Sequence, residues 1–400
     1  TDQESDKLYR NDGDKFTNVS EQAGVKSYGF SLGVTAGDIN NDGWQDLYIS
    51  SDYSIPDYVY INNGDNTFKN VVKEATSHTS FYGMGVDIAD INNDGFLDVF
   101  QADMDSKSSR RQKANMSSMN PEAFKEIIFM GFHYQYMHNC LQLNTGILED
   151  GVPQFTNISR LTGTSSTDWS WAPVFADFDN DGNKEWGIEH KGFSNGVAYA
   201  DLDNDGDLEI ITNNIDDYAS IYENTSSDIS NYISIEFIGE RKNKFGLGNR
   251  VYITTKDETQ MQELTLTRGF QSSVAPRLHF GLNKNKSIDK LKVVWTDGKT
   301  QILKNVKVNQ NLILNHADSS EEHVEIVKTN TLFKTIESPS LPKHKHIEND
   351  YDDFIKQVLL PHKMSAFGPA LAVGDLNNDG LDDFFIGGSH GHTGQLYFQT

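Results

Sequence analysis

The sequence predicts an all-β protein that combines β-propeller blades, a small β-sandwich-like domain and one helical insertion. Three observations support this fold class: a nine-residue string recurs five times, matched residues precede each copy at fixed distances, and strand-forming runs follow the copies. Several short strands per unit of about 50 residues are typical of propeller blades, whereas the repeats of a β-solenoid are shorter.

The recurring string combines acidic residues, asparagines and one glycine. Its copies read DINNDGWQD, DINNDGFLD, DFDNDGNKE, DLDNDGDLE and DLNNDGLDD, and they lie at 38–46, 90–98, 177–185, 201–209 and 375–383. Eight positions before the first Asp of each copy stands an aromatic residue: Phe30, Tyr82, Trp169, Phe193 and Phe367. Runs such as Leu47–Ile49 follow the strings, so each string is expected in a hairpin loop between two strands.

Oxygen-bearing side chains at string positions 1, 3, 5 and 9, with glycine at position 6, are what a calcium loop requires. Ca²⁺ takes six to eight oxygen ligands, and alternate residues of a tight loop can all point inward. The backbone carbonyl at position 7 is expected to join them, because the preceding glycine permits a sharp turn. We therefore expect one Ca²⁺ per loop, up to five in all. The candidate ligands are Asp38, Asn40, Asp42, Trp44 and Asp46; Asp90, Asn92, Asp94, Phe96 and Asp98; Asp177, Asp179, Asp181 and Asn183; Asp201, Asp203, Asp205, Asp207 and Glu209; and Asp375, Asn377, Asp379, Leu381 and Asp383.

The charge of the chain agrees with a bound cation. The strings hold 19 of the 58 acidic residues in a chain of net charge −24, and acids packed this closely repel one another unless a cation screens them. An EF-hand is excluded because it needs a Glu at position 12, where this chain has Ile49, Gln101, Thr212 or Ile386. We expect the metal to be structural, since a loop that saturates the ion leaves no open position for catalysis.

The spacing of the copies indicates an insertion and a join. Successive first aspartates are 52, 87 and 24 residues apart over the first four copies. The interval of 87 fits one blade plus a helical insertion at about 104–137, where Pro121 marks a helix start. The interval of 24 is too short for a blade, so we expect a missing segment at Lys184–Glu185. We also expect a fragment of a larger protein, because the chain begins and ends within a blade. The expected domains are an incomplete propeller over 1–230, a small β domain over 231–315, a linker over 316–345 and a truncated blade of a further propeller over 346–400.

These residues carry two resemblances. The repeat resembles the FG-GAP/VCBS family of calcium-binding β-propellers, and residues 231–315 resemble the ASPIC/UnbV domain of cartilage acidic protein-like and bacterial cell-surface proteins. The matching blocks of the second are Asn243–Val251, Gly269–Ser273, Phe280–Leu282 and Val294–Gly298. Thr296 departs from that family, which usually has Pro between Trp and Asp.

The resemblance to bacterial members also implies a location and a partner. Such proteins are typically secreted or held at the cell surface as lipoproteins, so it implies an extracellular or outer-membrane-associated protein. It makes an envelope protein, for example a TonB-dependent transporter, the expected partner, and it leaves a glycan open as another.

Composition and motifs exclude several functions. The net charge of −24 argues against nucleic-acid binding, no apolar run approaches the roughly 20 residues that span a bilayer, and no catalytic motif is present. We therefore expect a non-enzymatic, calcium-stabilised binding or scaffold protein that presents propeller loops to a protein or glycan. A subunit of an outer-membrane complex is a narrower form of this hypothesis. The alternative is a polysaccharide-degrading enzyme with its site at the propeller mouth, which predicts a cleft of carboxylates with perturbed pKa values outside the strings.

Two further groups of residues leave alternatives open. His133, His138 and Cys140 are close in sequence and suggest a transition-metal site or a Cys–His nucleophile, but without a further ligand at a defined spacing a packed strand edge is favoured. Trp169 occupies the aromatic position of the repeat, which favours the core, whereas Trp171 is open to a sugar-stacking role.

Overall fold

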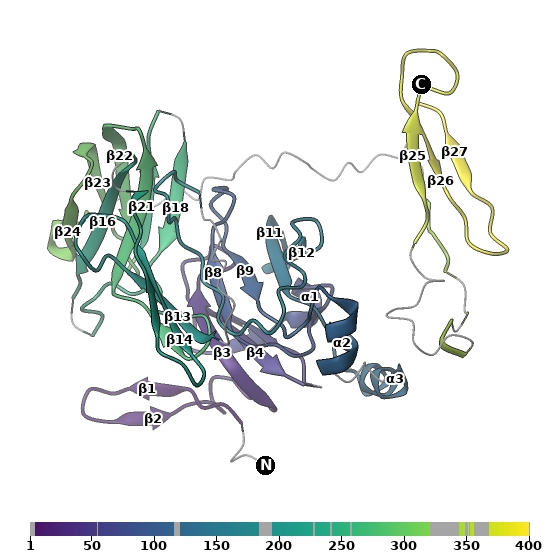
Figure 1. Cartoon of the computed structure of the whole chain (residues 1–400), viewed down its shortest axis with the longest axis horizontal. Helices are drawn as coiled ribbons and strands as arrows, with labels where there is room; N and C mark the ends of the chain where they lie inside the picture. The colour runs from purple at the N-terminus through teal and green to yellow at the C-terminus, as the bar shows by residue number, and fades with distance from the viewer. Residues whose placement is uncertain are drawn as a thin grey trace. The chain divides into compact units, whose positions relative to one another are not determined.

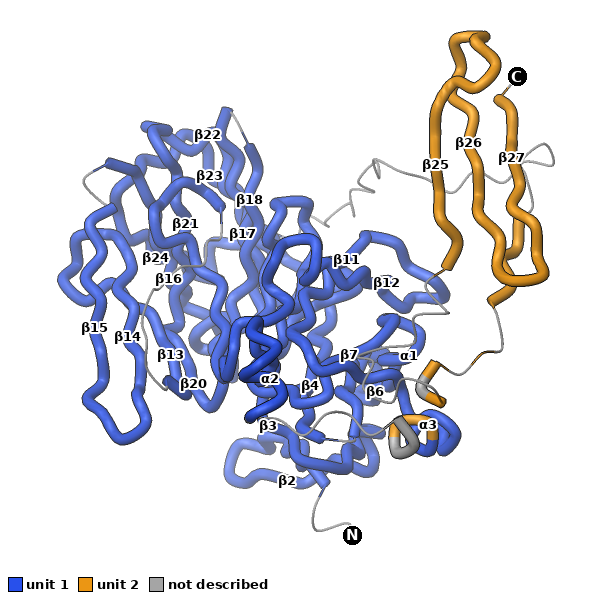
Figure 2. The backbone as a smooth tube through the Cα atoms, turned by 45° about the vertical axis from the view of Figure 1, so that its right-hand side comes forward, with its two compact units in different colours: residues 1–119, 126–327 blue, residues 120–125, 328–400 orange. Residues whose placement is uncertain are grey.

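The protein is described by a computed structural model, which covers residues 5–53, 55–115, 121–183, 194–226, 229–240, 242–256, 258–320, 344–348, 351, 353–355 and 368–399. Over these residues it is nearly all β, with three short α-helices, so the predicted fold class is confirmed. The chain forms two compact units, residues 1–119 with 126–327 and residues 120–125 with 328–400 (Figure 2). The suspected join at Lys184–Glu185 lies outside the described residues.

Two four-stranded antiparallel sheets have the up-and-down strand order of propeller blades (Figure 1). The first contains β3 (Phe30–Gly37), β4 (Asp46–Asp52), β5 (Tyr58–Asn62) and β6 (Phe68–Asn70). The second contains β8 (Val86–Ala89), β9 (Asp98–Gln101), β11 (Cys140–Glu149) and β12 (Val152–Asn157). A third sheet has three strands, β13 (Ser194–Ala200), β14 (Glu209–Asn214) and β15 (Ser220–Tyr222), and β1 (Tyr9–Asn11) pairs with β2 (Phe16–Asn18).

The helical insertion interrupts the second blade between β9 and β11. It contains α2 (Ser109–Asn115) and α3 (Pro121–Phe129), and α3 begins at the proline where the sequence predicts a helix start. The chain returns to the blade through β10 (Gln135–Tyr136), which pairs in parallel with β7 (Thr79–Ser80). Strand β7 itself follows the short helix α1 (Val72–Ala75) in the chain. This pairing places the end of the insertion beside the segment that leads into the second blade.

The region after the blades consists of two sheets around one apolar core. The first sheet contains β16 (Asn231–Ile238), β21 (Arg277–Asn283) and β24 (Asn311–Asn315); the second contains β17 (Arg250–Thr254), β18 (Thr259–Glu263), β22 (Ser287–Val294) and β23 (Thr300–Lys307). Buried residues of both sheets, among them Ile235, Phe280, Ile253 and Leu291, form a shared cluster, as in a β-sandwich. The pair β19 (Thr267–Arg268) and β20 (Ser272–Ser273) and a 3₁₀ helix at His316–Asp318 complete this region.

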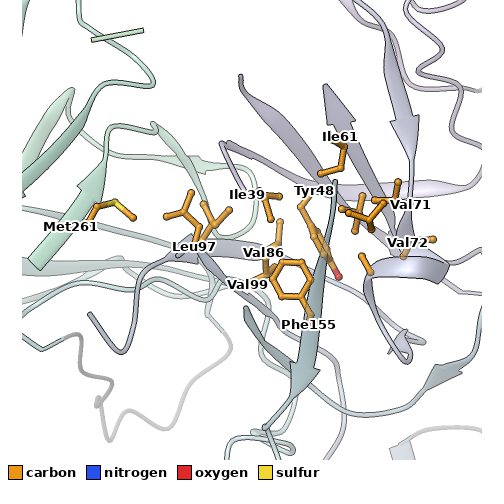
Figure 3. Close-up of a cluster of buried hydrophobic side chains, with 14 residues drawn as sticks. Ile39, Tyr48, Ile61, Val71, Val72, Val86, Leu97, Val99, Phe155 and Met261 are labelled. Atoms are coloured by element: carbon orange, nitrogen blue, oxygen red, sulfur yellow. The ribbon is translucent and has the colours of Figure 1, made fainter. Parts of the chain in front are cut away.

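A second apolar core joins the blades to this region. Ile39 and Tyr48 of the first blade pack with Val86, Val99 and other residues of the second, and Met261 of β18 belongs to the same cluster (Figure 3). The β18 strand is therefore packed on the blades.

The other compact unit contains a three-stranded antiparallel sheet. Its strands are β25 (Leu371–Gly374), β26 (Asp383–Ile386) and β27 (Gln395–Tyr397), and a 3₁₀ helix lies at Asp353–Ile355.

The two tryptophans of the third repeat lie differently from the expectation. Trp169 is 42% exposed, whereas Trp171 packs edge-on against Phe270 with ring centroids 5.0 Å apart. Phe30, which holds the same repeat position in the first copy, is also exposed, at 66%, whereas Tyr82 of the second copy is buried. The expected core role of Trp169 was therefore wrong, and Trp171 takes it.

Candidate calcium loops

Each of the four completely described strings is the hairpin loop that leads into the second strand of a sheet. In the four strings with a described last residue, position 9 is also the first residue of that strand: Asp46, Asp98, Glu209 and Asp383. In the third copy the structure describes positions 1 to 7, Asp177 to Asn183. Strands follow the four completely described strings, which is the hairpin context predicted from the sequence.

All five loops share one unusual backbone conformation. Asparagine at position 4 has a positive φ in every copy, with values of 60°, 58°, 58°, 63° and 61° for Asn41, Asn93, Asn180, Asn204 and Asn378. Glycine at position 6 also has a positive φ, between 85° and 98° in the five copies. Asn and Gly are the residues that tolerate this left-handed region best, so the repeat of these two residues fixes the repeat of the loop.

The carboxylates at positions 1 and 9 point into the loop and accept backbone N–H groups. In the first copy Oδ1 and Oδ2 of Asp38 accept the amides of Asp42 and Gly43 at 2.9 and 2.7 Å, and Oδ2 of Asp46 accepts the amide of Ile39 at 2.8 Å. The same bonds recur from Asp90 and Asp98 in the second copy and from Asp375 and Asp383 in the fifth. Asp177 accepts the corresponding pair in the third copy, and Glu209 accepts the amide of Leu202 in the fourth.

The remaining predicted positions lie in the same turns. Amide oxygens of Asn40, Asn92 and Asn377 accept the backbone N–H of the residue at position 5, as do the carboxylates of Asp179 and Asp203. Position-5 carboxylates in turn accept the N–H of position 7 at 2.7–3.1 Å. The acceptors at position 5 are Asp42, Asp94, Asp181, Asp205 and Asp379, and the donors at position 7 are Trp44, Phe96, Asn183, Asp207 and Leu381.

The third and fourth loops bring carboxylates close together. One oxygen from each of Asp177, Asp179 and Asp181 lies within 4.8 Å of the others, and Glu209 lies equally close to Asp201 with Asp203 and to Asp205 with Asp207. One oxygen of Asp201 and one of Glu209 are buried without a hydrogen-bond partner. This donor set fits a hard cation such as Ca²⁺, which binds carboxylate oxygens. In the fourth loop the side chain of Asp207 offers a ligand oxygen in addition to its backbone carbonyl, which the sequence predicted as a ligand.

Burial disfavours the charged form of several loop carboxylates. It raises the pKa of Asp38 to about 6, although Arg250 acts in the opposite direction, and it raises the pKa of Asp46 and Asp98 to about 7. Burial also raises the pKa of Asp201 and of Glu209. A cation in the loop would compensate this desolvation, because it favours the ionised carboxylate.

Hydrogen bonds connect successive loops side by side. The amide nitrogen of Asn41 donates to the carbonyl of Gly95, that of Asn93 to Gly182, and that of Asn180 to Gly206, each at 3.2 Å. The residue at position 4 of one string is thus bonded to the glycine at position 6 of the next. We call this series of three bonds the asparagine relay.

The domain after the blades contacts the first and third loops. Arg250 forms ion pairs with Glu263 at 2.7 Å and with Asp38 at 3.3 Å, and it also donates to Asn41. In the third loop Nε2 of His279 lies 2.6 Å from Oδ1 of Asn180, and the amide of Gly281 donates to Asp177 at 3.1 Å.

Sequence reasoning did not identify these contacts. Arg250 and His279 stand within or beside blocks that indicated the second domain, but no spacing connects them to a string more than ninety residues away.

Comparison with known proteins agrees with this organisation. FG-GAP-like repeats match residues 1–49 and 46–100, an FG-GAP repeat matches 367–398, and the ASPIC and UnbV family matches 239–321. Cartilage acidic protein 1 of Xenopus tropicalis is 23% identical over 303 residues, covering 71% of this chain and 44% of that protein. The human protein is 23% identical over 293 residues, covering 70% of this chain and 43% of its own length.

The chain thus spans less than half the length of these relatives. Among the described residues, no helix is long and apolar enough to cross a membrane. The chain carries FG-GAP repeats, which imply a β-propeller, together with an ASPIC and UnbV domain, and it is a homologue of cartilage acidic protein 1.

Proposed function

We propose that this chain is a calcium-stabilised, non-enzymatic binding or scaffold protein that presents propeller loops to a protein or glycan. FG-GAP repeats and an ASPIC and UnbV domain are typical of surface and binding proteins of the propeller type. The observation that carries the proposal is the common backbone of the five acidic loops, which places the same oxygen-bearing residues in the same turn five times.

Calcium would be held in each loop by the side chains at positions 1, 3, 5 and 9 and the carbonyl at position 7. Because Arg250 and Gly281 contact Asp38 and Asp177 directly, the state of these loops is coupled to the packing of the second domain. We propose a structural role for the ion: it stabilises the loops and, through them, the contact between blades and second domain.

The organisation, location and partner form a narrower part of the proposal. The domains are a propeller over 1–230, the ASPIC/UnbV-like domain over 231–315, a linker over 316–345 and a further blade over 346–400. The resemblance to bacterial cell-surface proteins supports an extracellular, outer-membrane-associated protein whose partner is an envelope protein, with a TonB-dependent transporter as one candidate.

The enzyme alternative has weaker support from the geometry. Outside the strings, burial raises the pKa of Asp57 to about 7 and that of Asp103 to about 6. Both residues are at most 1% exposed, and each accepts hydrogen bonds from neighbouring blade residues. A polysaccharide cannot reach these two carboxylates, so they do not form the cleft that the enzyme alternative predicts, and we favour the binding role.

Purification of the full-length protein from its native envelope, once in calcium and once in a calcium-selective chelator, tests the function. We expect a stoichiometric envelope protein to co-purify in calcium and to be lost in the chelator. A protein that co-purifies with nothing, binds no glycan on an array and cleaves polysaccharides would contradict the proposal.

A further inference from the structure

Two histidines and one cysteine from separate segments meet at the start of β11. They are His78, which directly precedes β7, His138, which follows β10, and Cys140, the first residue of β11. One ligand atom of each lies within 4.8 Å of the other two, and Sγ of Cys140 is 3.9 Å from Nδ1 of His138. We propose that these three residues bind a transition-metal ion, and that Zn²⁺ is the ion their donor atoms fit best.

The strands hold the three residues in place. The parallel pairing of β7 with β10 matches Thr79 to Gln135, so the segments that carry His78 and His138 run side by side. The side chain of Gln142 on β11 donates to the carbonyl of His78 at 2.8 Å, which fixes that backbone against the strand that begins at Cys140. The cluster is therefore built on paired strands, which position ligands more accurately than a free loop.

The chemistry of the donors selects the ion. Two imidazoles and one thiol are a donor set for Zn²⁺ and other borderline or soft metals, whereas Ca²⁺ and Mg²⁺ prefer oxygen. In a tetrahedral zinc site with bonds of about 2.0–2.3 Å, neighbouring ligand atoms are roughly 3.3–3.7 Å apart. The observed 3.9 Å between Cys140 and His138 is only a few tenths of an ångström longer.

Neighbouring polar groups orient His78 as a ligand. Its Nδ1 lies 3.0 Å from Oγ of Ser77, and its Nε2 lies 3.0 Å from the side-chain nitrogen of Asn157. The side-chain oxygen of Asn157 accepts the amide of Ser159, which fixes its NH₂ group toward His78. Nε2 is therefore the acceptor and Nδ1 carries the proton, so a metal that replaces the Asn157 contact meets a lone pair on Nε2.

A metal ion would have to displace the thiol proton of Cys140, because burial raises the pKa of this thiol well above its ordinary value. The same burial lowers the pKa of His78 to about 4 and also lowers that of His138. Cys140 and His138 are buried whereas His78 is half-buried, so an ion would reach the cluster from the side of His78. Three protein ligands leave a fourth position for water, and the bound ion would join the end of the helical insertion to the second blade.

Titration of the full chain with Co²⁺ tests the proposal. Saturating Ca²⁺ keeps the acidic loops filled, and Co²⁺ serves as the spectroscopic probe. We expect one Co²⁺ per chain, with a sulfur-to-cobalt charge-transfer band and the intense visible bands of tetrahedral cobalt, which one equivalent of Zn²⁺ removes. Cys140→Ser should abolish the charge-transfer band, and His78→Gln should weaken zinc binding at least roughly 10-fold, because even residues outside the first ligand sphere have effects of 10–100-fold.

His133→Gln is the matched control. This buried histidine belongs to the same insertion, but its Nε2 lies 3.1 Å from Oγ1 of Thr76, and it is not part of the cluster of three. The His133→Gln protein should keep the cobalt spectrum. Because His78 is half-buried, His78→Gln remains informative even if Cys140→Ser does not fold. An octahedral cobalt spectrum without sulfur bands, or unchanged zinc affinity in His78→Gln, would overturn the proposal.

Discussion

The first and fifth loops have the same conformation in different surroundings. Asp38 and Asp375 accept the same two backbone amides, and Asp46 and Asp383 accept the same third one, at distances that differ by at most 0.3 Å. The first loop is packed against a second domain through Arg250 and Glu263, whereas Asp375 is exposed in the loop between β25 and β26.

The comparison separates what the string encodes from what packing adds. The string alone is sufficient for the turn, because Asn and Gly at positions 4 and 6 adopt the same left-handed conformation in both loops. Position 9 is buried in both loops, as Asp46 and Asp383, whereas position 1 is buried only in the first loop, where burial raises the pKa of Asp38. Calcium should therefore affect global stability most where the loop supports a domain contact.

The largest expected effect comes from removing the charge that packs on the first loop. Arg250→Met leaves the buried carboxylate of Glu263 without its cation, even when calcium occupies the loop of Asp38, and we expect this to lower the free energy of unfolding by about 3–5 kcal/mol. Urea unfolding in saturating calcium measures this. Arg10→Met, which removes an exposed pair with Asp12, is the control and should leave the free energy of unfolding nearly unchanged. Equal losses in the free energy of unfolding for Arg250→Met and Arg10→Met would contradict a stabilising role for the contact between the first loop and the second domain.

A matched pair of ligand substitutions tests the comparison directly. Asp46→Asn and Asp383→Asn change the same string position, and each is expected to weaken calcium binding in its own loop. A site held at 100 times its dissociation constant contributes about 2.7 kcal/mol, so Asp46→Asn should lower the calcium-dependent stability of the main unfolding transition by up to that amount. Asp383→Asn should leave this transition unchanged within about 0.5 kcal/mol. Differential scanning calorimetry with and without chelator distinguishes them, and a shift of the main transition in Asp383→Asn would show that the loops are equivalent.

A pH dependence is expected from a buried acid outside the loops. Burial raises the pKa of Asp57 to about 7 in the folded protein, compared with about 3.9 in an unfolded chain. Between these values the folded state holds more protons, so stability is lost as pH rises from about 4 to 7, by at most about 1.4 kcal/mol per pH unit. In saturating calcium, Asp57→Asn should flatten the dependence of Tm on pH. Parallel curves for the two proteins would disprove the raised pKa.

The sequence was sufficient for the features that neighbouring residues determine. The alternation of oxygen-bearing residues predicted the hairpin turns and their inward carboxylates, because a residue such as Asn41 or Gly43 sets its own backbone conformation. Matched flanks predicted blades, and Pro121 predicted the start of α3.

Features that depend on long-range packing were not predictable in this way. Arg250 meets Asp38 across 212 residues, and no local pattern on either side indicates the partner. His78 joins His138 and Cys140 through a short parallel strand pair, which carries too few residues to be recognised from periodicity. Of the aromatic residues at the shared repeat position, Phe30 and Trp169 are 66% and 42% exposed whereas Tyr82 is buried, so the repeated position does not by itself determine burial.

The asparagine relay makes the protein sensitive to chemical ageing. Hydrolysis of the side-chain amide of Asn41, Asn93 or Asn180 would convert it to an aspartate, which accepts hydrogen bonds but cannot donate one. The bond to the next glycine would then be replaced by a carboxylate facing a carbonyl oxygen. Each such event would add a negative charge to a loop that is already acidic. It would also remove the hydrogen bond between two successive loops. Loss of a single side-chain amide can therefore weaken the contact between neighbouring loops while the order of the strands stays the same.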